Sequence, residues 1–168
     1  METPSRVLGV DPGLVATGYC VLEMAPGGAV RLLEGGVVRT PGEASLERRL
    51  KELHGGLREV VAEFQPEAVA VEALYAHYRH PRTAILMAHA RGVVLLVAAE
   101  AAVAVESYAA TQVKEALTGQ GRATKRQVQQ MVQRRLALAR PPEPPDVADA
   151  AAVALCHYDH TRDRRTRP

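Results

Sequence analysis

The chain has 168 residues, 47% of them hydrophobic and 24% charged, with a formal net charge of +2, all ordinary for a soluble globular domain with a sizeable core. No apolar stretch reaches the length of a membrane span without interruption, since the nearest, 93–105, is too short and contains Glu100. The N-terminus does not resemble a signal peptide and the two cysteines lack CxxC spacing, so we expect a cytoplasmic protein with reduced thiols and no membrane partner.

The first forty residues predict a three-stranded antiparallel meander. An apolar run ends at Asp11 without polar alternation, which is typical of a central strand covered on both faces. Pro12-Gly13 turns the chain, and strands over 17–23 and 29–40 follow, separated by a Pro-Gly-Gly turn. A carboxylate at the end of a buried strand is costly unless something pairs with it, although an ordinary β-turn aspartate would also explain Asp11.

The rest of the chain predicts crossover units. Leucine and valine at steps of three and four predict a helix over 45–64, and the apolar strand after it ends in Glu72 and should run parallel to an earlier strand. A helix over about 83–102 is apolar on nearly every face, which predicts burial in the core or against a partner. A strand over 103–108 and helices over 111–118, 124–136 and 146–158 complete an α/β fold, a mixed sheet with helices on both faces. We expect one domain over 1–160 and a basic, disordered tail over 161–168.

Four carboxylates form the candidate catalytic and metal site. If the strands ending in Asp11 and Glu72 are parallel neighbours, both carboxylates emerge at the sheet edge where α/β folds bind ligands. Asp146 and Asp149 lie three residues apart at a helix start, on nearly one face, although capping alone would also explain them. Neighbouring carboxylates repel unless a cation lies between them, and oxygen ligands suit Mg²⁺ or Mn²⁺. Four of them could hold two ions roughly 4 Å apart for in-line phosphoryl transfer by water.

Basic residues gather in one segment. No acidic residue lies between Glu115 and Glu143, whereas six basic ones do: Arg122, Lys125, Arg126, Arg134, Arg135 and Arg140. This favours a phosphate-binding surface over a solvated helix face, which usually carries both signs of charge. Lys114 and Lys125, which we expect to open helices or to lie in their first turns, could each hold a phosphate or be solvated. The loop 73–82 adds Arg79, Arg82 and Tyr75, an aromatic that could stack on a base or anchor the loop.

Motifs spread over residues 6–158 resemble the RuvC family, the crossover junction endodeoxyribonucleases that resolve Holliday junctions. They are G-V-D-P-G with T-G-Y after it, A-V-E at 70–72, A-R-G at 90–92, Q-V-K at 112–114, the segment 119–131 and P-D-V-A-D-A at 145–150. The resemblance implies an RNase H-like fold with a five-stranded sheet ordered 3-2-1-4-5. It also implies hydrolysis that depends on two Mg²⁺ ions, with Mn²⁺ as a substitute, and leaves 5′-phosphate and 3′-hydroxyl ends.

The resemblance also implies roles for individual residues. Asp11, Glu72, Asp146 and Asp149 match the four acidic positions of the family. Tyr75 stands where family members usually have the Phe that wedges into the junction, and Lys114 and Lys125 match DNA-contacting positions.

Finally, the resemblance implies partners and a biological role. A homodimer would make paired symmetric nicks in recombination and repair, together with the RuvA and RuvB branch-migration proteins, and the helix 83–102 is the candidate interface. Two alternatives stay open: a binding-only junction protein, and an RNase H-like nuclease acting on another nucleic acid. A kinase of the actin–hexokinase type would need a second phosphate-binding lobe, which this chain lacks.

Overall fold

The computed structural model describes residues 4–74 and 81–166, and these build a five-stranded mixed sheet. The strands β1 (Ser5–Asp11), β2 (Ala16–Met24) and β3 (Val30–Arg39) form an antiparallel meander, and β4 (Ala68–Glu72) and β5 (Ala104–Tyr108) extend it in parallel with β1. The order across the sheet is β3-β2-β1-β4-β5, which confirms the predicted topology.

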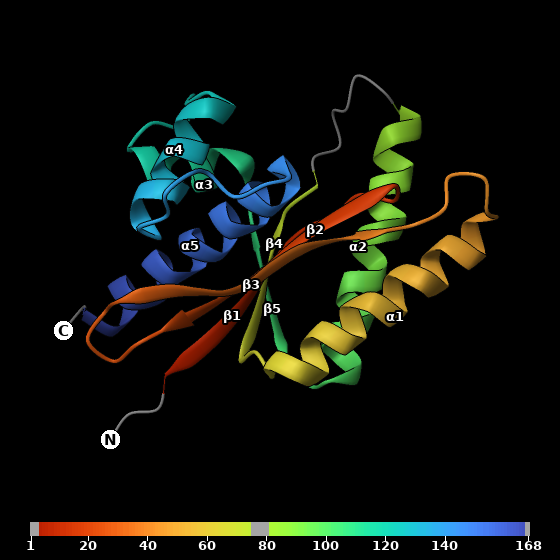
Figure 1. Ribbon diagram of the computed structural model, residues 1–168, viewed down its shortest axis with the longest axis horizontal. Helices are drawn as coiled ribbons and strands as arrows, with labels where there is room; N and C mark the ends of the chain where they lie inside the picture. The colour runs from red at the N-terminus through yellow and green to blue at the C-terminus, as the bar shows by residue number, and fades with distance from the viewer. Residues whose placement is uncertain (1–3, 75–80, 167–168) are drawn as a thin grey trace.

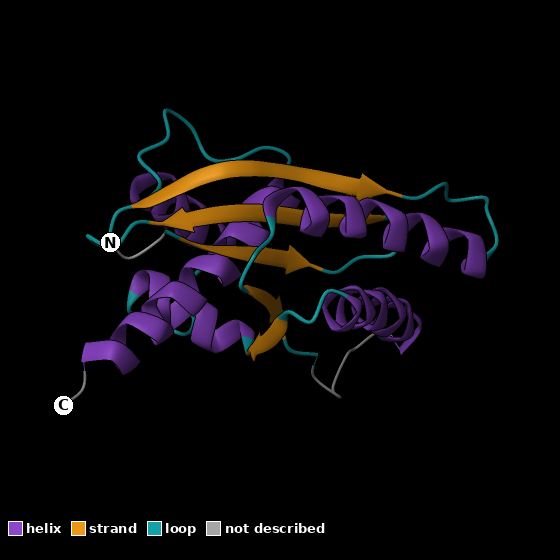
Figure 2. Cartoon of the chain, turned by 90° about the horizontal axis from the view of Figure 1, so that it is seen from below, coloured by secondary structure: helices purple, strands orange, loops and turns teal. Residues whose placement is uncertain are grey.

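Helices cover both faces of this sheet, as predicted. On one face lie α1 (Leu46–Phe64) and α2 (Pro81–Glu100), and on the other lie α3 (Ala110–Thr118), α4 (Lys125–Arg135) and α5 (Pro145–Thr166) (Figure 1). Figure 2 shows the same layers at right angles, with the strands twisted between them. Consecutive residues of β1 enter opposite cores, Val7 towards α5 and Leu8 towards α1 and α2. Burial on both faces explains why β1 shows no polar alternation.

The helix α2 is only partly buried within one chain. Its inner side packs through Ala90, Val94 and Ala98, whereas Ile85 and Leu96 are 57% and 51% exposed. By length and composition alone α2 could cross a membrane, which the sequence-based scan did not anticipate, although core helices of soluble proteins pass the same test. The sequence predicted burial of this helix in the core or against a partner. Within the single chain only one side of α2 is buried, and the apolar face that contains Ile85 and Leu96 is not covered.

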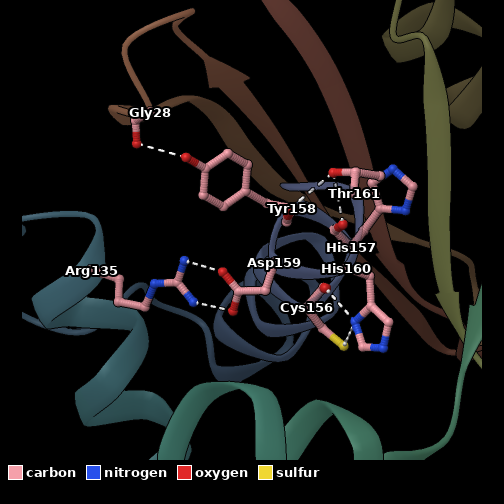
Figure 3. Close-up of polar contacts among 8 residues, drawn as sticks. All are labelled: Gly28, Arg135, Cys156, His157, Tyr158, Asp159, His160 and Thr161. Carbon is pink, nitrogen blue, oxygen red and sulfur yellow. Dashed lines mark hydrogen bonds and ion pairs between the residues drawn. The ribbon is translucent and has the colours of Figure 1, made fainter. Parts of the chain in front are cut away.

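The helix α5 continues to Thr166 instead of ending near Tyr158, so no end of secondary structure marks residue 160. Two contacts fix its second half (Figure 3). The Tyr158 hydroxyl donates to the Gly28 carbonyl at 2.7 Å, and Arg135 of α4 makes a bidentate ion pair with Asp159 at 2.6 and 2.7 Å. These partners, distant in sequence, stabilise turns that local sequence alone does not mark as helical.

The interior of this half of the molecule also contains polar and thiol groups. His157, expected near the end of the helix, is buried within α5, and its Nδ1 shares a hydrogen bond with the Tyr108 hydroxyl at 2.9 Å. Cys20 and Cys156 are both free and buried, and burial raises the pKa of the Cys156 thiol to about 12. The sequence left open whether these thiols lie in the core or at the surface, and the structure places both in the core.

Candidate active site

The first two predicted carboxylates lie at one edge of the sheet. The strands β1 and β4 are parallel neighbours, and their register pairs Val10 with Val71. Asp11 and Glu72 follow these residues, so they leave adjacent strands at the same level, as the sequence predicted. Behind Asp11, the buried Thr17 hydroxyl donates to the Gly13 carbonyl at 2.6 Å and accepts from the Gly13 amide at 3.2 Å, which braces the turn.

Two glycines bring the other two carboxylates to this edge. A Cβ added at Gly18 would lie 2.2 Å from the Asp146 carbonyl oxygen, and one at Gly9 would lie 2.1 Å from that of Ala150. The start of α5 therefore rests directly on the backbone of β1 and β2, which places Asp146 and Asp149 above Asp11. The sequence analysis gave these glycines no role, although glycine inside a strand is a known sign of close backbone approach.

Replacing Gly18 by Ala is expected to destabilise the protein by about 1–3 kcal/mol or more and to abolish any activity that needs Asp146 beside Asp11, because backbone atoms of α5 must shift. Thermal unfolding and the activity assay would measure both effects. Gly27→Ala is the matched control, since a Cβ there meets nothing within 4 Å. A Gly18→Ala variant with normal stability would show that α5 does not depend on this contact.

The four carboxylates share one electrostatic environment. Burial raises the pKa of Asp11 to about 7, and the negative charges of Asp149, Glu72 and Asp146 contribute, while Lys125 opposes the shift. Burial and the charge of Asp149 also raise the pKa of Glu72, against the effects of Lys114 and Lys125. Carboxylates that raise one another's pKa in this way form a cluster that a cation would stabilise.

The donor chemistry of this cluster fits a hard divalent cation, because every group is a carboxylate oxygen. As the side chains stand, however, no three His, Cys, Asp or Glu residues within 4–74 and 81–166 are arranged to hold a metal ion. The nearest positive charge is instead an ammonium group: Lys125 Nζ donates to Asp149 Oδ2 at 2.6 Å. The cluster thus already pairs with a cation, and a metal would need some carboxylates to reorient.

The remaining predicted site residues have different outcomes in the structure. Lys125 is the first residue of α4, after a Thr124–Gln127 capping box that confirms the predicted helix start. Lys114 lies beyond the first turn of α3, so the expected position in a first turn is wrong for it. Besides Lys125, the exposed basic candidates are Arg82, Arg122 and Arg126. Tyr75 and Arg79 lie outside the described residues, and Arg135 of the basic segment is taken up by Asp159.

Comparison with known proteins places the whole arrangement in one family. The family model of the crossover junction endodeoxyribonuclease RuvC matches residues 7–157. The chain belongs to the RuvC family. A RuvC from Rhodopirellula baltica is 50% identical over 155 residues, which cover 92% of this chain and 86% of that protein.

Solved RuvC structures share its fold. RuvC from Thermus thermophilus is 40% identical and superposes with a TM-score of 0.87, covering 95% of this chain and 96% of that one. RuvC from T. thermophilus in complex with a Holliday junction substrate is 37% identical, with a TM-score of 0.85 and coverage of 94% and 96%. The RNase H-like fold expected from the RuvC resemblance is confirmed.

Proposed function

We propose that this RuvC-family chain is a crossover junction endodeoxyribonuclease that resolves four-way Holliday junctions in recombination and repair by paired symmetric nicks. The observation that carries the proposal is a cluster of four carboxylates, brought together by β1, β4 and α5 at one edge of the sheet beside basic helices. The similarity along nearly the full chain to proteins named RuvC supports this assignment. The bound Holliday junction in a close structural neighbour supports the choice of substrate.

We assign metal binding to Asp11, Glu72, Asp146 and Asp149. Two Mg²⁺ ions held there, or Mn²⁺ in their place, would supply an activated water and stabilise the leaving oxygen, so that 5′-phosphate and 3′-hydroxyl ends remain. The half-buried Asp11 and Glu72 stand at the ends of adjacent strands, so the sheet sets their positions. Asp149 pairs with Lys125 and could exchange that partner for a metal ion. The fit rests on donor type and shared electrostatics.

The basic residues beside the cluster suit the phosphates of the junction. Lys125 and Lys114 lie next to the carboxylates, and Arg122 and Arg126 extend the positive surface along the exposed start of α4. Arg82 is the second residue of α2, which follows the segment that contains Arg79 and Tyr75 along the chain, and Tyr75 is the proposed stacking residue. We further propose one nuclease domain over 1–160, a basic C-terminal segment and a cytoplasmic location.

The proposed working form is a homodimer joined through α2, acting with RuvA and RuvB. Leu96→Glu should raise the dimer dissociation constant at least about a hundredfold, because each buried, unpaired carboxylate costs several kcal/mol. Analytical ultracentrifugation would measure it, with Leu46→Glu at the start of the neighbouring helix α1 as the control. If the Leu96→Glu variant still dimerises with unchanged affinity, the dimer interface does not lie on this face of α2.

Cleavage of a mobile four-way DNA junction, beside a linear duplex of the same sequence, with and without Mg²⁺, tests the proposed function. Paired nicks at symmetric positions, on the junction alone and only with metal, are the expected result. Metal-dependent cutting of both substrates would show a nuclease that is not specific for junctions. Binding without cutting would favour a binding-only role.

A further inference from the structure

One ion pair in the carboxylate cluster joins α4 to α5 through a largely exposed lysine. Lys125 Nζ donates to Asp149 Oδ2 at 2.6 Å, although the Lys125 side chain is 62% exposed and could extend into solvent. Among the described residues, this is the one ion pair that involves any of the four site carboxylates. An exposed ion pair contributes little free energy, so we attribute the position of Lys125 to the concentrated negative charge of the neighbouring carboxylates.

The fold holds Lys125 above this charge. The Thr124–Gln127 capping box fixes the start of α4, and buried Val128 and Val132 fix the helix in the core that it shares with α5. Lys125 also interacts electrostatically with Asp11, Asp146 and Glu72, whereas Lys114 acts on Glu72 without a hydrogen bond to it. Lys125 is therefore the counter-ion of the whole cluster, and Lys114 faces one side of it.

A metal ion and this ammonium group need the same oxygen. A divalent cation held by Asp149 together with Asp11 requires an Asp149 that is not paired with Lys125, and two cations cannot share that position without strong repulsion. While this pair is formed, no three acidic side chains within the described residues stand in a metal-binding arrangement.

We propose that Lys125 is a built-in counter-ion that occupies the metal site through Asp149 and must be displaced before the divalent ions bind. The ammonium then leaves Asp149 and is free to contact a substrate phosphate at the same edge. The inference rests on the proposed function, since it assigns metal binding to the four carboxylates. It predicts that this lysine weakens metal binding in the absence of DNA.

The test is Mn²⁺ binding by isothermal titration calorimetry, without DNA, at fixed pH and low salt. Lys125→Met should bind Mn²⁺ about three- to tenfold more tightly than the natural chain, and Lys125→Arg, which keeps the charge, should stay close to it. Lys114→Met is the matched control: it removes one nearby positive charge but no ion pair, and should change the affinity about twofold or less. In EDTA, Lys125→Met should also melt at a lower temperature.

Each result decides a different point. Unchanged or weaker Mn²⁺ binding by Lys125→Met, with a far-ultraviolet circular dichroism spectrum like that of the natural chain, would overturn the competition. If Lys114→Met increases the Mn²⁺ affinity as much as Lys125→Met does, the increase comes from general electrostatics, and the specific role of Lys125 is overturned. If the natural chain binds no Mn²⁺, or binds it equally well after Asp146→Asn, the proposed metal site itself fails and the inference fails with it.

Discussion

Replacing Asp146 by Asn is expected to lower junction cleavage by at least about 10²–10³-fold while junction affinity stays within about twofold. The Asp146 carboxylate makes no side-chain hydrogen bond or ion pair within the described residues, so the fold does not depend on it. Its position is fixed by the backbone, because α5 rests on Gly18. Asn keeps the size and removes the charge that would hold a metal, so the loss should fall on chemistry and not on binding. Single-turnover cleavage and junction binding on the same preparation would measure both.

Glu143→Gln is the control for this substitution, since it removes the same charge from an exposed residue in the segment that leads into α5. It should leave both cleavage and binding unchanged. If Asp146→Asn loses junction binding together with cleavage, the residue is structural. If it retains cleavage, Asp146 is not a metal ligand, and the helix N-terminus alone explains its position.

The fold was predictable because its decisive signals are local. An uninterrupted apolar run indicated a strand buried on both faces, and a crossover helix before β4 implied parallel pairing with an earlier strand. The same logic placed Asp11 and Glu72 at one edge, and the β1–β4 register agrees. The roles of Gly9 and Gly18 were not assigned, because they depend on which helix lies above them.

What the sequence did not predict depends on contacts between distant residues. At the point where we expected α5 to end, Tyr158 binds Gly28 and Asp159 binds Arg135, and no local signal near residue 160 encodes those partners. The Lys125–Asp149 pair joins residues of two helices whose separation only tertiary packing sets. Exposure along α2 was likewise undetermined, since an all-apolar helix fits both a core and an interface.

Replacing Asp11 by Asn should raise the melting temperature of the metal-free protein at pH 8 by roughly 8–16 °C. The folded-state pKa of Asp11 is about 7, well above the ordinary 3.8, mainly through burial and then through Asp149, Glu72 and Asp146. The unfolded chain therefore loses its proton at lower pH than the folded chain, and Asp11 costs stability as the pH rises from about 4 to 7. Above pH 7 this cost is roughly 4 kcal/mol, which Asn removes.

The sign and the pH window make this prediction specific. In EDTA, the advantage of Asp11→Asn should shrink to less than half between pH 8 and pH 5, because most of the cost develops between those values. With saturating Mg²⁺ the order should reverse, since the metal stabilises only the chain that keeps its carboxylate. Asp159→Asn is the matched control: it loses the bidentate pair with Arg135, so it should melt at a lower temperature whether or not metal is present. An Asp11→Asn variant that melts below the natural chain in EDTA at pH 8 would mean that the carboxylates do not converge, and the shared metal site would have to be abandoned.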